Sequence, residues 1–397
     1  MPGHHAVVIH NQHQAQTVLE QIGVDPEGYP YLLPKALFRS ILLKNIPCQA
    51  ANIIKQEMLA KGGEAAVSRE ALSLEGQTDV LLMGTLKQYR LLIRKLRVQP
   101  FGLKKVAAQI ETILQGLEQS GERLILANGR ELQLGRRTLI MGILNITPDS
   151  FSDAGRYLEP AQAVKRALEM AAEGADIIDV GGASSRPGGS IAGPEEELDR
   201  ILPVVEQLSQ AGLIISVDTF RGRVAQACLE AGAHLINDIG RLQLDKELLP
   251  VLVEHQAPVV LMHNRLQMRR GEPYRDLVSD IVEELQESIQ EAMDAGVPGE
   301  RIIIDPGVGF GKTREENLRL IKRLQEFRSL GKPLLLGASR KTFIGQTLDL
   351  EVGDRLEGSL AVVAMGVLNG ADMVRVHDVK ESKRVAAMCD AVVRSDG

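Results

Sequence analysis

Apolar positions from about residue 138 onward fall into short runs separated by longer amphipathic stretches. The runs are rich in Val, Ile and Leu and too short for helices, which is the pattern of strands buried on both faces. The predicted strands lie at residues 139–145, 176–181, 213–218, 234–238, 258–263, 301–306, 333–338 and 372–377. The stretches between them have the period of a helix, at residues 161–173, 194–211, 221–231, 245–256, 276–295, 314–330, 354–369 and 380–393.

The number of strand–helix pairs selects one fold class. Eight such pairs within about 260 residues are typical of a (β/α)₈ TIM barrel, whereas a doubly wound open sheet usually has fewer strands. We therefore predict a catalytic barrel over residues 138–397.

Polar residues follow nearly every predicted strand, at the point where its apolar run ends. A single Asp in such a place is more often a helix N-cap than a ligand-binding group. The carboxyl ends of barrel strands converge on one rim, so eight polar ends in register favour a shared pocket there. The residues are Asn145, Asp179, Asp218, Asn237, Asp238, His263, Asp305, Ser339, Arg340, Lys341, Arg375 and His377.

The first 125 residues follow a different pattern and predict a separate, smaller α/β domain. Helices are expected at residues 34–45, 49–61, 86–97 and 103–117, and a short strand at 78–84. Residues 126–137 are interpreted as a linker, because turn-forming pairs such as Asn128-Gly129 lie there. No clustered ligand set in the domain indicates its function.

Composition and charge exclude several classes of protein. The net charge of −6 does not indicate a nucleic-acid or membrane surface. Three widely spaced cysteines, without CxxC or Cys/His spacing, disfavour a disulfide framework and a zinc site. Residues 1–16 lack the apolar segment of a signal peptide, and no apolar run approaches the ~18 residues of a membrane span. We expect a soluble cytoplasmic protein.

Two long motifs carry a family resemblance. Residues 140–155 read Ile-Met-Gly-Ile-Leu-Asn-Ile-Thr-Pro-Asp-Ser-Phe-Ser-Asp-Ala-Gly, and residues 174–187 read Gly-Ala-Asp-Ile-Ile-Asp-Val-Gly-Gly-Ala-Ser-Ser-Arg-Pro. Both resemble signatures of the dihydropteroate synthase family of pterin-binding barrels. Shorter pieces agree, at residues 218–219, 237–238, 262–263, 305–312, 339–341 and 375–377. The resemblance covers about residues 138–395 and does not reach the first 125.

The resemblance implies an activity and a set of residue functions. The family joins 6-hydroxymethyl-7,8-dihydropterin pyrophosphate to para-aminobenzoate, giving 7,8-dihydropteroate and pyrophosphate in folate biosynthesis. A carboxylate suits the guanidine-like edge of the pterin, because it can accept paired hydrogen bonds. The pterin residues implied are Asp218, Asn237, Asp305 and Lys341, with Met262 and Phe310. Of the residues named, the resemblance makes Lys341, Asp218, Arg375 and His377 the catalytic ones.

Two further subsites follow from the same resemblance. Asn145, Arg186, Arg375 and His377 would bind pyrophosphate, and Asn145 would also be a ligand of Mg²⁺, which prefers hard oxygen ligands. The para-aminobenzoate site would use Phe151, Ser185, Arg186, Pro187 and Thr342. The family often has Glu and Thr where this chain has Ala183 and Ser185, so no carboxylate function is assigned at position 183.

Alternative interpretations remain open at this point. The run 307–313 is not a P-loop, because Pro306 stands where GxxxxGK[ST] requires its first Gly. A methyltetrahydrofolate–corrinoid methyltransferase shares the pterin-binding barrel but needs no pyrophosphate site. A non-catalytic barrel with a partner-binding N-terminal domain is a third possibility. We expect a homodimer that binds small-molecule substrates. For the first 125 residues, dimer contacts and docking of another folate-pathway enzyme are the two functions considered.

Overall fold

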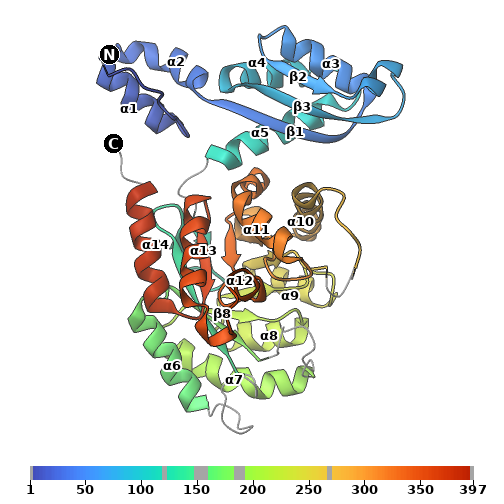
Figure 1. Cartoon of the computed structure of the whole chain (residues 1–397). Coiled ribbons are helices and arrows are strands. Elements are labelled where there is room, and N and C mark those ends of the chain that lie inside the picture. Colours follow the sequence, from blue (N-terminus) through green and yellow to red (C-terminus); the bar gives the residue numbers. More distant parts are fainter. Residues whose placement is uncertain (1–2, 119–122, 147–159, 183–192, 266–270, 394–397) are drawn as a thin grey trace. The chain divides into compact units, whose positions relative to one another are not determined.

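The computed structural model describes residues 3–118, 123–146, 160–182, 193–265 and 271–393 (Figure 1). The chain divides into two compact units, one formed by Met1–Glu118 and the other by Gln119–Arg394. Each unit has its own buried apolar core. They are described separately below.

The first unit is a three-stranded antiparallel sheet with helices. Its sheet has the order β1-β3-β2, from β1 (Phe38–Pro47), β2 (Glu64–Val67) and β3 (Gln77–Thr85). The helices are α1 (Gln12–Ile22), α2 (Tyr29–Ala36), α3 (Cys48–Leu59), α4 (Leu86–Leu96) and α5 (Leu103–Glu118), with short 3₁₀ turns at Pro26–Gly28 and Arg69–Ser73. The predicted small α/β unit is therefore present.

One element of the first unit differs from its prediction. Residues 34–45 were expected to form a helix, but the chain is extended from Phe38 onward. Ile41 and Leu43 point into the core, whereas Leu42 between them is 48% exposed. Alternate burial is the period of a strand, so the helix prediction was wrong there.

The second unit is the expected barrel. Its parallel strands are β6 (Leu139–Asn145), β7 (Ile177–Gly181), β8 (Ile215–Asp218), β9 (Leu235–Asp238), β10 (Val259–Met262), β11 (Ile302–Asp305), β12 (Leu335–Gly337) and β13 (Met373–Val376). The order is β11-β10-β9-β8-β7-β6-β13-β12, and a parallel bridge between Ile304 and Leu334 joins the two ends. The eight strands thus form a closed ring, as predicted.

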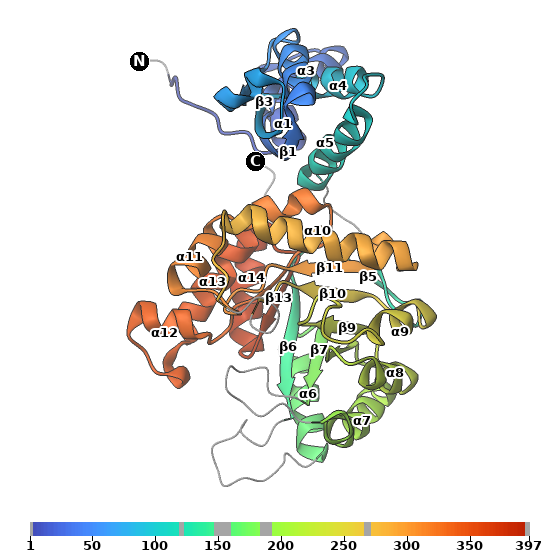
Figure 2. The ribbon, with the colours of Figure 1, turned by 90° about the vertical axis from the view of Figure 1, so that its right-hand side faces the viewer.

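Helices surround this ring (Figure 2). They are α6 (Pro160–Glu173), α7 (Pro194–Gln210), α8 (Gly222–Glu230), α9 (Leu248–Glu254), α10 (Leu277–Ala295), α11 (Arg314–Lys322), α12 (Thr342–Leu348), α13 (Leu356–Leu368) and α14 (Val379–Val393), with 3₁₀ turns at Gly299–Arg301, Leu324–Leu330 and Val352–Asp354. Their apolar faces pack on the outer side chains of the strands in one large core cluster. That packing holds the strand ends in place.

A short hairpin closes the N-terminal end of the barrel. It consists of β4 (Arg123–Ile125) and β5 (Glu131–Gln133), which pair antiparallel. Leu124, Leu126 and Leu134 are at most 1% exposed and cluster with residues at the beginnings of the barrel strands, such as Leu139 and Ile177. Residues 126–137 therefore pack as part of the barrel unit, and their interpretation as a linker is corrected.

Candidate active site

The polar strand ends meet at the C-terminal rim of the barrel, where the pairing register aligns them. Asn145 lies opposite Gly181, and Asp218 lies opposite Asn237. Glycines on two strands lie next to these polar side chains: a Cβ at Gly181 would stand 3.5 Å from Asn145 Oδ1 and 3.5 Å from Asp218 Cβ. A Cβ at Gly337 would stand 3.5 Å from Asp305 Oδ2 and 3.8 Å from Arg375 Cβ.

Arg375 on β13 is held between two carboxylates from other strands. Its Nε donates to Asp179 Oδ2 at 2.6 Å, and its Nη2 donates to Asp218 Oδ2 at 2.7 Å. The Nδ2 of Asn237 also donates to Asp179 Oδ2, at 3.1 Å. Four strands of the barrel, β7, β8, β9 and β13, are thereby cross-linked by one polar cluster.

The charges in this cluster do not cancel. Burial raises the pKa of Asp218 to about 7, against the attraction of Arg375, and the negative charge of Asp179 adds to the rise. Burial opposes the charged form of Arg375, but Asp179 and Asp218 outweigh it and raise its pKa. Two carboxylates share one guanidinium, so buried Asp218 takes up a proton near neutral pH while Arg375 stays cationic.

Asp305 and Lys341 form a second polar group beside the first. Asp305 Oδ1 accepts a hydrogen bond of 2.7 Å from the backbone N–H of Gly307, and the residue is 3% exposed. Burial raises the pKa of Asp305, whereas Lys341 acts to lower it. The ammonium of Lys341 donates to the Val308 carbonyl and lies 4.4 Å from the centre of the Phe310 ring. Burial lowers the pKa of Lys341 to about 8.

His377 and its neighbours complete the rim. His377 Nδ1 lies 3.1 Å from Ser339 Oγ, to which its own backbone N–H also donates. Arg340 forms an ion pair with Asp378. Thr342 is the exposed first residue of α12, and Met262 ends β10 with 4% exposure.

Structure and sequence agree on part of the predicted site. The described residues bring Asp218, Asn237, Asp305, Lys341 and Arg375 into two adjoining polar groups. The positions predicted for para-aminobenzoate and pyrophosphate at Phe151, Ser185, Arg186 and Pro187 lie outside the described residues. Sequence reasoning noted Asp179 and His263 as polar strand ends but gave neither a function, and it gave Lys312 none either.

Two features are absent from the part of the chain that the structure describes. It contains no group of three or more His, Cys, Asp or Glu side chains placed to hold a metal ion. None of its helices is long and apolar enough to cross a membrane.

Comparison with known proteins gives concordant matches. The family model for "Pterin binding enzyme" matches residues 141–377. A dihydropteroate synthase of Clostridium beijerinckii is 47% identical over 267 residues, covering 67% of this chain and 98% of that protein. The crystal structure of Xanthomonas albilineans dihydropteroate synthase with 4-aminobenzoic acid aligns with a TM-score of 0.66 at 40% identity, covering 70% of this chain and all of the other.

One relative extends through the N-terminal unit. A probable bifunctional folylpolyglutamate synthase/dihydropteroate synthase of Halobacterium salinarum is 39% identical over 385 residues. The match covers 95% of this chain but 46% of that protein. Since it leaves about 5% of the chain unmatched, it includes most of Met1–Glu118.

Proposed function

This chain belongs to the pterin-binding enzyme family, as a dihydropteroate synthase, and from that premise we propose how its own residues join the pterin pyrophosphate to para-aminobenzoate. The premise rests on a family match over residues 141–377 and on relatives whose whole barrel is covered. The observation that carries the proposal is the adjacency of two different polar groups at one rim. Asp305 and Lys341, together with Asp218 and Asn237 of the first group, suit a neutral heterocycle. The guanidinium of Arg375 suits an anion.

The pterin ring is assigned to Asp305, Asn237, Asp218 and Lys341. Asp305 keeps Oδ2 available while Oδ1 is held by Gly307, so its carboxylate can accept hydrogen bonds from the guanidine-like edge of the ring. Lys341 is the donor for the ring carbonyl. Met262 and Phe310 supply apolar surface next to these groups.

Pyrophosphate is assigned to Arg375 and His377, with Asn145 and Arg186. The hydrogen bonds of Arg375 to Asp179 and Asp218 use Nε and Nη2, so Nη1 is the edge of the guanidinium that can face a phosphate oxygen. The two carboxylates fix the direction in which that edge points. Preorganised cationic donors of this kind stabilise charge that develops on a leaving group.

A Mg²⁺ ion fits this site only with help from the substrate. Asn145 contributes one neutral oxygen, and the described residues provide no cluster of anionic ligands around it. Magnesium usually keeps several waters and is bound through substrate phosphates, which matches such a sparse donor set. Bound with the substrate, it would neutralise charge on the departing pyrophosphate.

The reaction is a substitution at the pterin methylene carbon. The bond between that carbon and the pyrophosphate oxygen breaks, and the electron pair leaves with pyrophosphate. The arylamine nitrogen of para-aminobenzoate then forms the new C–N bond and loses a proton to solvent. Phe151, Ser185, Arg186 and Pro187 are assigned to that second substrate, and Thr342, at the start of α12, to its carboxylate. The protein provides positioning and charge stabilisation rather than a nucleophile.

The test is incubation of the pure protein with the pterin pyrophosphate, para-aminobenzoate and Mg²⁺, with the product identified by mass. Dihydropteroate and pyrophosphate in equal amounts are the expected result. Absence of product from folded protein would contradict the assignment. A corrinoid methyltransferase, the rival activity, would transfer a methyl group from methyltetrahydrofolate and would not release pyrophosphate.

The proposal also covers the cellular location of the enzyme, its oligomeric state and its N-terminal unit. The cysteines Cys48, Cys228 and Cys389 are all free thiols, which is consistent with a cytoplasmic protein. We assign it the homodimeric state expected from the sequence, for which the solution mass is the measurement. The N-terminal unit is assigned no part in the chemistry, because every residue assigned to a substrate or to Mg²⁺ lies in the barrel unit.

A further inference from the structure

One loop of the barrel contacts both of the charged groups assigned to the pterin. The loop runs from Gly307 to Lys312 and follows β11. Gly307 donates its N–H to Asp305, Val308 accepts from Lys341, and the Phe310 ring lies against the same ammonium. The position of this loop therefore sets where the carboxylate and the ammonium stand.

Lys312, the last residue of the loop, stabilises the loop through hydrogen bonds. The Nζ of Lys312 donates to the carbonyls of Gly307 at 2.8 Å and Phe310 at 3.0 Å, so it ties the two ends of the loop together. It also lies 3.0 Å from Nδ1 of His263, which follows β10. Gly307 packs directly against the backbone of His263, since a Cβ there would stand 1.8 Å from the His263 carbonyl oxygen, and its φ of +68° favours glycine.

The imidazole of His263 has one possible tautomer in this setting. A carboxylate can only accept, so Nε2, which lies 3.1 Å from Glu284 Oε2, carries the ring proton and donates it to Glu284. Nδ1 then accepts from Lys312. Burial, followed by the positive charge of Lys312, lowers the pKa of His263 to about 3, which agrees with a neutral ring.

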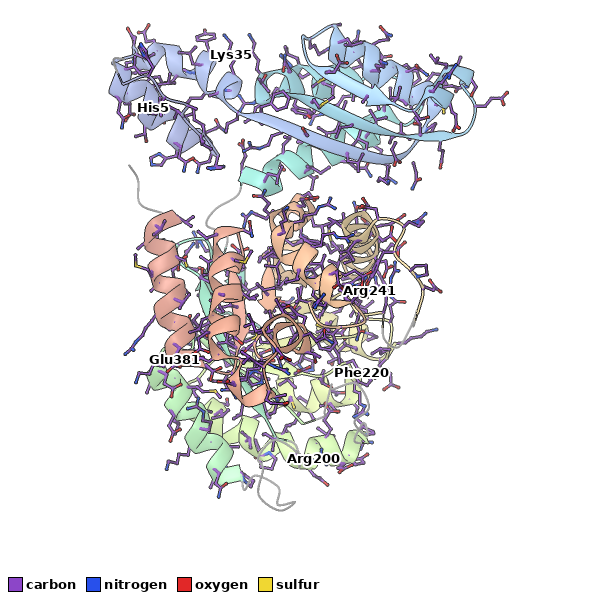
Figure 3. The ribbon with its side chains drawn as sticks, viewed as in Figure 1. His5, Lys35, Arg200, Phe220, Arg241 and Glu381 are labelled. Atoms are coloured by element: carbon purple, nitrogen blue, oxygen red, sulfur yellow. The ribbon has the colours of Figure 1, made fainter. Side chains whose placement is uncertain are left out.

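Glu284 anchors this chain of contacts to helix α10. Its carboxylate is paired with Arg265 at 2.5 Å and with Arg241 at 3.2 Å, and both arginines are buried. The guanidinium of Arg265 in turn lies 4.0 Å from the ring centre of Tyr274. Arg241 is labelled on the barrel in Figure 3, where its place can be followed.

We propose that Lys312 and His263 are positioning residues for the pterin. His263, held by Glu284, orients the ammonium of Lys312. The ammonium holds the Gly307–Lys312 loop, and the loop places Asp305 and Lys341 where each can hydrogen-bond to the ring. The inference rests on the proposed function and deepens it. Neither residue touches the reacting atoms, so neither is catalytic.

The nature of the buried groups supports positioning over simple packing. Burial lowers the pKa of Lys312 to about 7, which shows that the site resists holding the ammonium. Apolar side chains of similar volume commonly fill such places at equal or greater stability. What a polar donor adds here is direction, because its hydrogen bonds to the Gly307 and Phe310 carbonyls both lie on the loop that contacts Asp305 and Lys341.

The test compares four single variants for kcat and for the KM of each substrate. Lys312→Met removes the ammonium and keeps the chain length, and His263→Leu removes its orienting ring. His263→Gln is the conservative variant, since an amide offers one acceptor and one donor. Lys332→Met is the matched control. Lys332 lies just before β12, at the opposite rim of the barrel, where it donates to the Gly299 carbonyl.

The expected result is a selective change. Lys312→Met and His263→Leu should raise the KM of the pterin pyrophosphate at least ~10-fold, about 1.4 kcal/mol, and leave the KM of para-aminobenzoate within ~2-fold. His263→Gln should recover most of the loss, and Lys332→Met should match the unmodified enzyme. Equal changes for both substrates, or no rescue by glutamine in folded protein, would overturn the proposal.

A binding measurement keeps the inference separable from the proposed reaction. Calorimetric titration with the free pterin, without second substrate, reports the ring site even in a protein that makes no product. If Lys312→Met fails to fold, the His263→Leu and His263→Gln pair gives the same comparison. Equal pterin affinity in that pair would refute the positioning role, whereas loss with leucine and recovery with glutamine would support it.

Discussion

Asp179 is the residue whose replacement best tests the architecture of the anion site. It is fully buried at the end of β7, and its Oδ2 accepts hydrogen bonds from both Arg375 and Asn237. Asp179→Asn preserves the shape but exchanges the charge for an amide. Both donors bond to the same oxygen, so an amide oxygen in its place can still accept from both, but the negative charge that holds the guanidinium of Arg375 is lost.

The size of the effect follows from the charge that is lost at the contact with Arg375. That bond, at 2.6 Å, is worth about 1.5–3 kcal/mol with a charged acceptor, against about 0.5–1.5 kcal/mol for a neutral one. The difference, about 1–1.5 kcal/mol, is the expected loss in transition-state stabilisation. It corresponds to a fall in kcat/KM for the pterin pyrophosphate of roughly 5- to 13-fold.

A matched control lies on the approach to the same strand. Asp176 pairs with Arg137 through contacts of 2.7 and 2.6 Å, but at the N-terminal end of the barrel. Asp176→Asn should reduce thermal stability and leave kcat/KM within ~3-fold. Steady-state kinetics of both variants, measured on protein shown to be folded by circular dichroism, make the comparison. Wild-type kinetics in Asp179→Asn would show that Arg375 needs no such support.

Three more predictions concern pH, metal and domain organisation. Because burial raises the pKa of Asp218 to about 7, its contribution to stability is present below pH ~4 and is lost as the pH rises through 7. The unfolding free energy of the wild type, from denaturant titrations, should therefore decline relative to that of Asp218→Asn between pH 5 and 8; parallel curves would contradict this. Exhaustive chelation should abolish turnover and added Mg²⁺ should restore it, so full activity in chelator would exclude the metal. A protein beginning at Gly121 should fold and keep most of its turnover, and a folded but inactive truncation would give the N-terminal unit a part in catalysis.

The barrel could be predicted from the sequence because both faces of its strands are buried. Runs such as Leu139–Asn145 are apolar along their length, and their polar ends mark the rim. The same reasoning failed at β1, where one face of the sheet is exposed yet carries Phe38 and Leu42. Because Phe38 and Leu42 are apolar although exposed, the sequence does not show the alternation of apolar and polar residues expected of a strand. The apolar positions of the segment alone therefore had the spacing of a helix.

The site was predicted by residue type, but its internal pairing was not. Asp179 and Arg375 are 196 positions apart in the chain, and nothing in the local sequence of either says that they meet. Lys312 belonged to residues 305–312, a run that resembles the family and was rejected as a phosphate loop, but it was given no function of its own. Its contacts with Gly307 and Phe310 depend on the turn that the loop makes, and that turn is set by backbone contact with His263. Contacts of this kind come from tertiary packing, which periodicity and spacing do not encode.

The hairpin of β4 and β5 has a consequence for how this enzyme can be combined with other domains in evolution. Because Leu124, Leu126 and Leu134 complete the barrel's own core, the barrel does not need a neighbouring domain to bury that end. A gene segment for such a unit can be joined to different partners without a new interface having to evolve first. The relatives follow this pattern: the Clostridium beijerinckii protein is matched over 98% of its length by 67% of this chain, whereas the Halobacterium salinarum protein joins a longer version to another synthase. A barrel that completes its own core is a module that recombination can move.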